Sequence, residues 1–204
     1  MTKYSDRVWV FDDAINLAYQ HKIKECLLGP DFPWFVKEGV SHHKDYDAPW
    51  PKPVYKEPVY AFSHLFISYS NGESSVNSGF SKDLEPLVSA SCKKIDFQPE
   101  RILMGRCFLQ LPLRLKNDEL ETPHVDSTDK HNLVVLYYVM DSDGDTVIYE
   151  NKWNGEKIES FDNLVEKTRV SPKQGRVVMF DGFYFHTVVR PKNSIRCVIN
   201  FNVI

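Results

Sequence analysis

The stretch "SIRCVINFNV", residues 194–203, alternates between two kinds of side chain. Successive side chains of a β-strand point to opposite faces. One face would carry only apolar side chains, from Ile195, Cys197, Ile199 and Phe201; the other would carry Arg196, Val198 and Asn200. A buried guanidinium is costly without a partner. We therefore expect the apolar face to pack in a core and Arg196 to face a cavity that holds an anion.

Short β-branched or aromatic runs of this kind fill the chain after about residue 97. They are separated by Gly, Pro, Asn and Asp, which is typical of antiparallel strands joined by turns. The other runs are "RILMGRCFLQLPL", "NLVVLYYVMD", "DTVIYEN", "GRVVMFDG" and "YFHTVV". Their spacing predicts an antiparallel barrel or jelly roll, with helices packed on one outer face.

The N-terminal half predicts those helices. "FDDAINLAYQHKIKECLLGP", residues 11–30, has apolar side chains at helical spacing, with Asp12 or Asp13 as the expected cap and Gly29-Pro30 as the stop. "SKDLEPLVSASCKKI", residues 81–95, predicts a second helix with Pro86 in its first turn. Between them, residues 31–78 are rich in proline and aromatics; we expect extended, ordered loop followed by one or two strands in "VYAFSHLFISYS".

Composition favours one domain. The chain has 204 residues, of which 42% are hydrophobic, enough for a single well-buried core. We expect residues 1–204 to form one domain, with about 1–97 supplying helices and an extended substrate-side segment and about 98–204 the jelly-roll core. A net charge of −3, the absence of a long apolar run and scattered cysteines predict a cytoplasmic protein with reduced thiols, without membrane association. Nucleic-acid binding through a local basic groove stays open, as does the oligomeric state.

Three residues have the types and spacing of a metal site. In the extended segment "TPHVDSTDK", His124 and Asp126 would point to the same face. His186 lies in a strand near the far end of the β region, and distant strands of a jelly roll lie side by side. Two imidazoles and one carboxylate suit non-heme Fe(II), although nitrogen and oxygen ligands also accept zinc, manganese, cobalt or nickel.

The ordered set of motifs resembles the iron(II)- and 2-oxoglutarate-dependent oxygenases, and most closely their prolyl-hydroxylase-like branch. "HVD" at 124–126, "LYYV" at 136–139, "GDTVIYE", "SPKQGRVVMF" before His186, and Arg196 ten residues after it carry the resemblance. It covers about residues 101–204, and Asp145 replaces the second glycine of the Gly-Gly-x-Thr pattern. The resemblance implies a double-stranded β-helix, a cupin-like jelly roll.

The resemblance also assigns roles to residues. It implies that His124, Asp126 and His186 bind Fe(II) as the catalytic centre, and that Arg196 pairs with the distal carboxylate of 2-oxoglutarate, assisted by Tyr138. The loop before His124 lacks the tyrosine expected at the keto-acid end of 2-oxoglutarate, so Gln110 and Arg114 are the candidates there. Other readings stay open: a turn for His124 and Asp126, a core role for His186 or Tyr138, and a surface pair for Arg196.

The implied activity is that of a dioxygenase: O2 and 2-oxoglutarate are consumed, a C–H bond is hydroxylated, and succinate and CO2 are released. A prolyl or other amino-acid side chain of a protein is the first expectation for the substrate, and a small molecule is the second. The alternative from another class is a non-catalytic jelly-roll protein that binds a metal or a carboxylate. We expect the aromatic, proline-rich segment from Ser41 to Tyr60, with His42, His43, Tyr46, Trp50 and Tyr55, to border the metal cavity; a strap across the back of the sheet is the other reading.

Overall fold

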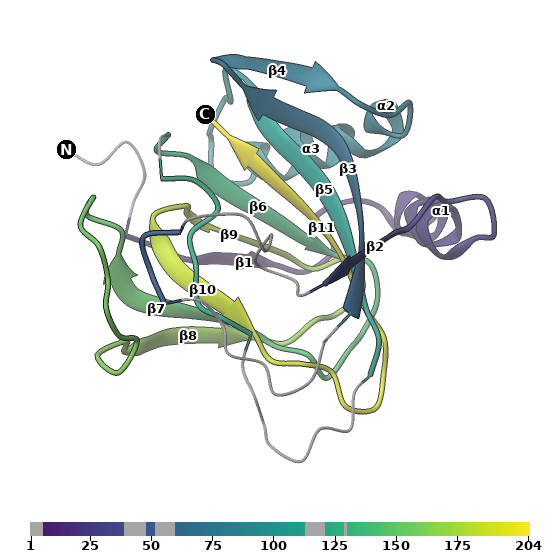
Figure 1. Ribbon diagram of the computed structural model, residues 1–204. Helices are drawn as coiled ribbons and strands as arrows, with labels where there is room; N and C mark the ends of the chain where they lie inside the picture. The colour runs from purple at the N-terminus through teal and green to yellow at the C-terminus, as the bar shows by residue number, and fades with distance from the viewer. Residues whose placement is uncertain (1–5, 39–47, 52–59, 113–120, 129) are drawn as a thin grey trace.

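A computed structural model describes residues 6–38, 48–51, 60–112, 121–128 and 130–204 (Figure 1). Within these residues the chain forms two antiparallel β-sheets and three helices. The strands are β1 (Trp9–Phe11), β2 (Phe35–Glu38), β3 (Tyr60–Ser70), β4 (Glu73–Val76), β5 (Ile102–Gln110), β6 (Leu133–Tyr138), β7 (Thr146–Lys152), β8 (Glu166–Val170), β9 (Val177–Asp181), β10 (Tyr184–Val188) and β11 (Arg196–Val203).

The larger sheet has the order β1-β9-β6-β11-β5-β3-β2, with β4 paired to β3; the smaller sheet has the order β10-β7-β8. Strands distant in the sequence are therefore neighbours, as a jelly roll requires. The predicted fold class, mainly β with a double-stranded β-helix core and supporting N-terminal helices, is confirmed. All six runs predicted as strands after residue 97 are strands.

The structure adds strands that the sequence pattern did not indicate. β8, "EKTRV", is an edge strand of the smaller sheet, and β1 and β2 are the two edges of the larger one. An edge strand is short and partly solvated, so it lacks the apolar run that marks a central strand. "VYAFSHLFISYS" is one long strand, β3, and not two.

The first helix, α1 (Leu17–Leu28), begins later than predicted. Asn16 caps it, since its side chain accepts a hydrogen bond from the Tyr19 backbone N–H at 2.9 Å, so a cap at Asp12 or Asp13 was wrong. Asp12 instead pairs with Arg176, and Asp13 lies in the left-handed region with φ of 51°. The predicted end at Gly29 is confirmed.

The second predicted helix is divided in two, α2 (Ser81–Leu84) and α3 (Pro86–Lys93). Pro86 stands at the first turn of α3, where its missing N–H removes no helical hydrogen bond. In the described part of the chain, no helix is long and apolar enough to span a membrane.

Two apolar layers hold the sheets in place. The helices cover one face of the larger sheet, where Leu27 and Leu87 pack with Cys197, Ile199 and Phe201. A second layer fills the space between the sheets and includes side chains from β6, β7 and β9. The four cysteines are free, as predicted. Because β11 sends its odd-numbered side chains to the helical layer, its even-numbered ones face the space between the sheets, as the alternation predicted.

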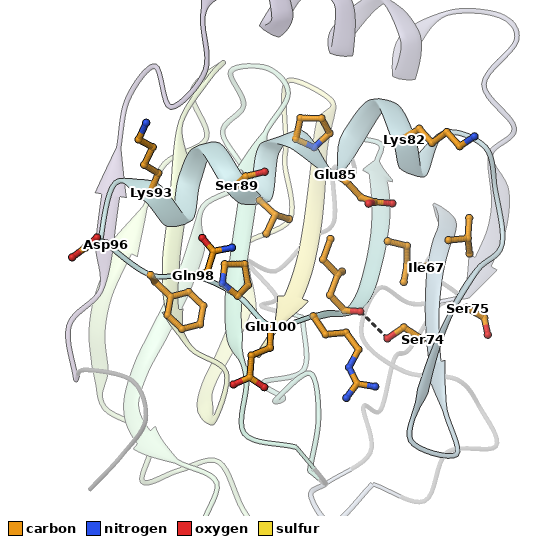
Figure 2. A pocket seen from close by; sticks show the side chains of 17 residues that line it. Ile67, Ser74, Ser75, Lys82, Glu85, Ser89, Lys93, Asp96, Gln98 and Glu100 are labelled. Carbon is orange, nitrogen blue, oxygen red and sulfur yellow. Dashed lines mark hydrogen bonds between the residues drawn. The ribbon is translucent and has the colours of Figure 1, made fainter.

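A large open groove of about 1060 Å³ lies between the α2–α3 segment and strands β3 and β4 (Figure 2). Charges of both signs line it, among them Lys82, Glu85, Lys93 and Asp96, and they are spread along the groove and do not converge on one point. None of the predicted site residues that the structure describes lies in this groove.

Candidate metal and carboxylate site

The two predicted histidines lie opposite each other. His124 forms an isolated antiparallel bridge with His186 of β10: each backbone N–H donates to the other residue's carbonyl, at 3.0 and 2.9 Å. Their ring centroids are 4.6 Å apart. The bridge therefore joins the segment before β6 to the smaller sheet and sets the separation of the imidazoles.

Backbone carbonyls orient both rings. Nδ1 of His124 lies 3.1 Å from the carbonyl oxygen of Thr122, and Nδ1 of His186 lies 3.1 Å from that of Tyr184. A carbonyl only accepts, so each Nδ1 donates and each Nε2 keeps its lone pair. This is the tautomer in which an imidazole binds a metal through Nε2.

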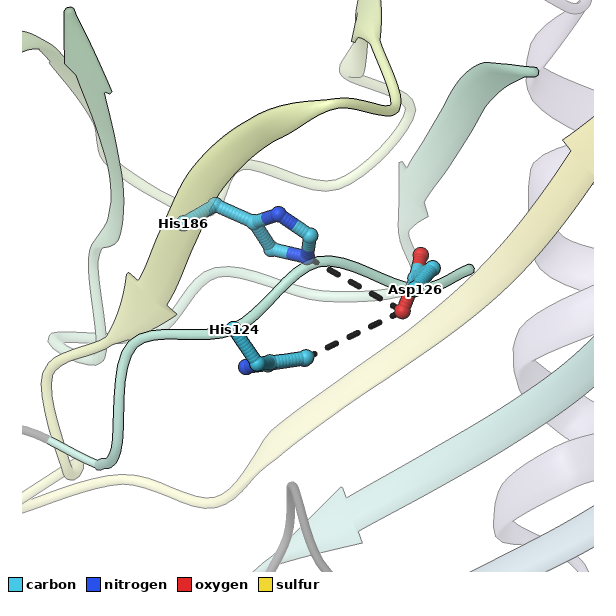
Figure 3. A group of neighbouring side chains, drawn as sticks. All are labelled: His124, Asp126 and His186. Carbon is cyan, nitrogen blue, oxygen red and sulfur yellow. Dashed lines mark ion pairs between the residues drawn. The ribbon is translucent and has the colours of Figure 1, made fainter. Parts of the chain in front are cut away.

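Asp126 completes the group. Its Oδ1 lies 3.8 Å from Nε2 of His124 and 3.9 Å from Nε2 of His186 (Figure 3). One ligand atom from each residue falls within 4.8 Å of the others. Figure 3 shows all three side chains pointing toward one another, with Asp126 Oδ1 facing both imidazoles.

Neighbours fix the carboxylate of Asp126. Oδ2 accepts hydrogen bonds from the side-chain amides of Asn200 at 2.9 Å and Asn202 at 3.0 Å, both on β11. Arg106 of β5 donates to Oδ1. Burial by itself raises the pKa of Asp126, but Arg106 and the imidazoles outweigh it and hold that pKa well below its usual value.

The donor set fits a divalent ion. Burial, together with the neighbouring His186, holds the pKa of His124 well below that of a free imidazole, which favours its neutral, metal-binding form. Two imidazole nitrogens and one carboxylate oxygen on one side of an ion match the facial triad of non-heme iron. The geometry is also compatible with other first-row metals.

Arg196 lies in the same cavity. The cavity has a volume of about 290 Å³ and is lined by His124, Asp126, His186 and Arg196 together. The guanidinium of Arg196 is buried and donates to the Gly144 carbonyl at 2.8 Å and to Gln110 Oε1 and Thr146 Oγ1, each at 2.9 Å. All three acceptors are uncharged, and no described carboxylate lies within ion-pair distance of Arg196. An anionic carboxylate entering from the cavity therefore fits this end.

The other predicted co-substrate residues surround Arg196. Gln110 of β5 is the register partner of Arg196 on β11. The pair Arg106 and Asn200, which contacts Asp126, lies further along the same two strands. The Gln110 side chain accepts a hydrogen bond from Arg196, and its predicted role at the keto-acid end stays a prediction. Tyr138 is fully buried, and its hydroxyl donates to Thr146 Oγ1 at 2.7 Å, so it reaches the cavity through Thr146. Its predicted role stays a prediction, and Arg114 lies outside the described residues.

Sequence reasoning gave no role to Thr146, Arg106 or Lys37, which are among the residues that line this cavity. Thr146 lies in the stretch that resembles Gly-Gly-x-Thr; taken as its threonine, it puts Gly144 at the second glycine and Asp143 at the first, so the alignment that put Asp145 at the second glycine was shifted by one residue. Arg106 shares a face of β5 with Phe108 and Gln110, and strand alternation would have found it. Lys37 of the edge strand β2 also lines the cavity, and no sequence signal pointed to it. Burial, together with the nearby Arg106, lowers the pKa of Lys37 to about 8.

The Ser41–Tyr60 segment is described only in part. Trp50 lines the cavity and is buried, and its ring meets those of Trp153 and Phe185 edge-on, each at 5.8 Å between centroids. Trp50 therefore belongs both to the cavity wall and to the apolar cover of the smaller sheet. His42, His43, Tyr46 and Tyr55 lie outside the described residues. The remaining histidines are structural or exposed: His64 contacts the Pro33 carbonyl, His131 pairs with Asp181, and His21 lies on the surface of α1.

No protein-family model and no curated protein sequence matches the chain. Solved structures do match its fold. A 2OG-Fe(II) oxygenase family oxidoreductase from Burkholderia pseudomallei aligns with a TM-score of 0.65 at 11% identity, over 96% of this chain and 84% of that one. A prolyl hydroxylase from Trichoplax adhaerens, in complex with a hypoxia inducible factor peptide, aligns with a TM-score of 0.60 at 11% identity, over 98% and 84%.

The similarity extends to enzymes of another kind. The non-heme alpha ketoglutarate dependent epimerase SnoN from nogalamycin biosynthesis aligns with a TM-score of 0.64 at 11% identity, over 98% of this chain and 78% of that one. The fold of this chain is thus the one found in 2-oxoglutarate-dependent Fe(II) oxygenases. Because prolyl hydroxylases and small-molecule enzymes both share it at the same identity, the fold does not select the prolyl branch.

Proposed function

We propose that this protein is an Fe(II)- and 2-oxoglutarate-dependent dioxygenase that hydroxylates a C–H bond. One observation carries the proposal: the His124–Asp126–His186 group and the buried Arg196 line a single cavity of about 290 Å³. A structural metal site does not require a buried cation beside it, and a site that binds only a carboxylate does not require a metal triad. The two together suit a co-substrate that binds a metal at one end and a cation at the other.

The residues divide the work between them. His124, Asp126 and His186 would hold the iron, which, when bound together with 2-oxoglutarate and O2, supplies the oxidising chemistry that yields succinate and CO2. Asn200 and Asn202 keep the carboxylate of Asp126 in position. Arg196 would bind the distal carboxylate through its planar guanidinium. Hydrogen bonds to Gln110 and Thr146 hold that guanidinium in position.

The apolar wall of the cavity would exclude water. Phe108, Phe180 and Val198 line it, and their side chains supply no polar groups that compete with the co-substrate. Water exclusion strengthens the electrostatic contacts inside such a site and limits side reactions. We keep as the first candidate substrate an amino-acid side chain of a protein, such as proline, in analogy to the peptide complex of the Trichoplax enzyme; a small molecule is the second.

The proposal is tested by succinate formation from 2-oxoglutarate. Purified protein with Fe(II), ascorbate and O2 should convert 2-oxoglutarate slowly on its own and faster with a true substrate. His186→Ala should abolish the conversion, whereas His21→Ala, on the exposed face of α1, should not change it. If wild-type protein that binds metal and 2-oxoglutarate forms no succinate with any of a broad panel of peptides and small molecules, the non-catalytic binding protein becomes the better account.

A further inference from the structure

A chain of buried amides extends from Asp126 to Asn132, the residue just before β6. Asn202 of β11 donates through Nδ2 to two acceptors, Asp126 Oδ2 at 3.0 Å and Asn132 Oδ1 at 2.9 Å. Asn132 donates through its own Nδ2 to the Lys130 carbonyl at 2.8 Å. Asn202 is 1% exposed and Asn132 0%. Asn132 is therefore connected to a proposed metal ligand through a single side chain.

The carboxylate of Asp126 sets the direction of every hydrogen bond in this chain. An ionised carboxylate only accepts, so the atom of Asn202 that faces it must be the amide nitrogen. The second hydrogen of that nitrogen needs an acceptor, so the Asn132 atom beside it must be Oδ1. The Asn132 nitrogen then faces the Lys130 carbonyl, which also only accepts. Turning either amide over would bring like groups together, which is costly in a buried site.

The Asn202 amide depends on its two acceptors for its orientation. Its Oδ1 is buried and has no hydrogen-bond partner among the residues that the structure describes. Both contacts that orient the amide are therefore made by Nδ2. Loss of the Asn132 oxygen would leave one N–H of a buried amide without its acceptor, and the N–H that donates to Asp126 would lose the contact that keeps it aimed.

A glycine makes room for the Asn132 side chain. Gly182 lies in the turn between β9 and β10, and its N–H donates to the Asn132 carbonyl at 2.8 Å. An alanine Cβ at position 182 would lie 2.7 Å from Asn132 Cγ and 2.8 Å from Nδ2, and closer still to Oδ1. The φ of Gly182 is not positive, so this close approach, and not the backbone conformation, excludes a side chain. The same turn leads into the strand that carries His186.

We propose that Asn132 is a positioning residue of the metal site, which acts through Asn202 on the carboxylate of Asp126, and that position 182 is glycine to leave space for this amide. The inference rests on the proposed function, because it concerns a ligand of the proposed metal. A role for Asn132 only in satisfying the Lys130 carbonyl would use its nitrogen and not its oxygen.

The test uses Co(II) alone as the probe, because its visible absorption reports on its ligands. Titration of the purified protein gives the Kd and the spectrum of the bound ion. Asn202→Ala should raise the Kd by about tenfold, and Asn132→Ala by at least about threefold, as for groups that orient metal ligands. In protein that already carries Asn202→Ala, Asn132→Ala should change the Kd by less than about 1.5-fold, because two residues that act through one contact are not additive. Both single variants should shift the spectrum in the same direction.

Two further variants control the comparison. Asn200 donates to the same oxygen of Asp126 without a hydrogen bond to Asn132, so Asn132→Ala should keep its full effect in Asn200→Ala protein. Gly182→Ala displaces the amide without removing it, so it should also raise the Kd for Co(II). Its cost in thermal stability, measured without metal, should be smaller in Asn132→Ala protein, which lacks the atoms that the new Cβ would meet. Asn154→Ala, at an exposed position, should change nothing.

The outcomes separate this inference from the proposed function. If the wild-type protein binds no Co(II), the proposed function fails, and the positioning role fails with it. If Co(II) binds but Asn132→Ala leaves the Kd and the spectrum unchanged, or weakens binding equally with and without Asn202, the positioning role alone is overturned. If Asn132→Ala does not fold, an unchanged Kd in Gly182→Ala overturns it instead. An equal stability cost of Gly182→Ala in wild-type and Asn132→Ala protein would contradict the role given to the glycine.

Discussion

The guanidinium of Arg106 donates to Asp126 Oδ1, the same oxygen that faces Nε2 of both His124 and His186. A proposed metal ligand is thus joined directly to a cation of β5. This pairing lowers the pKa of Asp126 and keeps the carboxylate ionised. It also links the geometry of the candidate metal site to the larger sheet, because Arg106 is the register partner of Asn200, which holds the other oxygen of Asp126.

Replacing Arg196 tests the carboxylate end of the site. Arg196→Lys keeps the charge but loses the planar fork, so the Kd for 2-oxoglutarate should rise by about 10- to 100-fold, the range of a lost charged hydrogen bond. Metal affinity measured without 2-oxoglutarate should stay within twofold. Calorimetry with Mn(II) measures both, and Arg169→Lys on the exposed face of β8 is the control. An unchanged Kd for 2-oxoglutarate would assign the acid to another residue.

Replacing Asn200 tests whether the amide hydrogen bonds to Asp126 contribute to metal affinity. Asn200→Ala removes one of the two amides that donate to Asp126 Oδ2, so metal affinity should fall by about tenfold, as is usual for groups that orient metal ligands. Competition with a fluorescent chelator measures the affinity, and Asn154→Ala, an exposed position, serves for comparison. Equal metal affinities for the two variants would mean that Asn202 alone suffices.

Asp143 holds the turn before β11, the strand that begins with Arg196, through hydrogen bonds whose contribution to stability depends on pH. Its carboxylate accepts hydrogen bonds from the backbone N–H groups of Lys192 at 3.1 Å and Asn193 at 2.9 Å and from Ser194 Oγ at 2.8 Å. Burial opposes ionisation, but these donors outweigh it and lower the pKa of Asp143 to about 2. Its contribution to stability is therefore fully present above its unfolded pKa of about 4 and is lost as the pH falls toward 2.

Asp143→Asn should accordingly reduce the free energy of unfolding at pH 7 by about 1 kcal/mol, after allowance for solvent screening of this exposed carboxylate. The difference between wild type and variant should shrink between pH 5 and pH 3. Urea unfolding at several pH values measures it. A difference that is constant over this range would show that the hydrogen bonds of Asp143 do not depend on its charge.

Replacing Trp50 tests whether residues 48–51, the described middle part of the Ser41–Tyr60 segment, belong to a separate lid or to the core. Because Trp50 packs edge-on against Trp153 and Phe185, Trp50→Ala should cost about 3 kcal/mol of stability. Trp50→Phe should recover more than half of that loss. Chemical denaturation measures both variants. Full stability in Trp50→Ala would indicate a lid that is only loosely attached to the smaller sheet.

Much of this architecture follows from the sequence because central strands carry their pattern locally. The alternation in β11 predicted which side chains face the core and which face the cavity, and the structure agrees for Arg196, Val198 and Asn200. The convergence of His124, Asp126 and His186 was predictable only through the ordered motifs, since no local rule brings residues 60 positions apart into contact.

The remaining features depend on tertiary contacts. The cap of α1 lies at Asn16 because Asp12 is taken by Arg176, 164 residues away. Lys37 reaches the cavity only because β2 pairs with β3, and nothing in "FVKE" indicates that pairing. Gln110 was a candidate for the keto-acid end because the loop before His124 lacks a tyrosine; its position beside Arg196 follows from the register of β5 against β11, which neither segment shows alone.

The central claim is that one cavity binds Fe(II) and 2-oxoglutarate together, and anaerobic absorption spectroscopy tests it most directly. Fe(II) and 2-oxoglutarate added together should produce a weak visible metal-to-ligand band that neither gives alone. The band should be absent in His186→Ala and should need more 2-oxoglutarate in Arg196→Lys. A wild-type protein that binds both Fe(II) and 2-oxoglutarate, yet shows no such band, would contradict the account, because the keto acid would then not be bound to the metal.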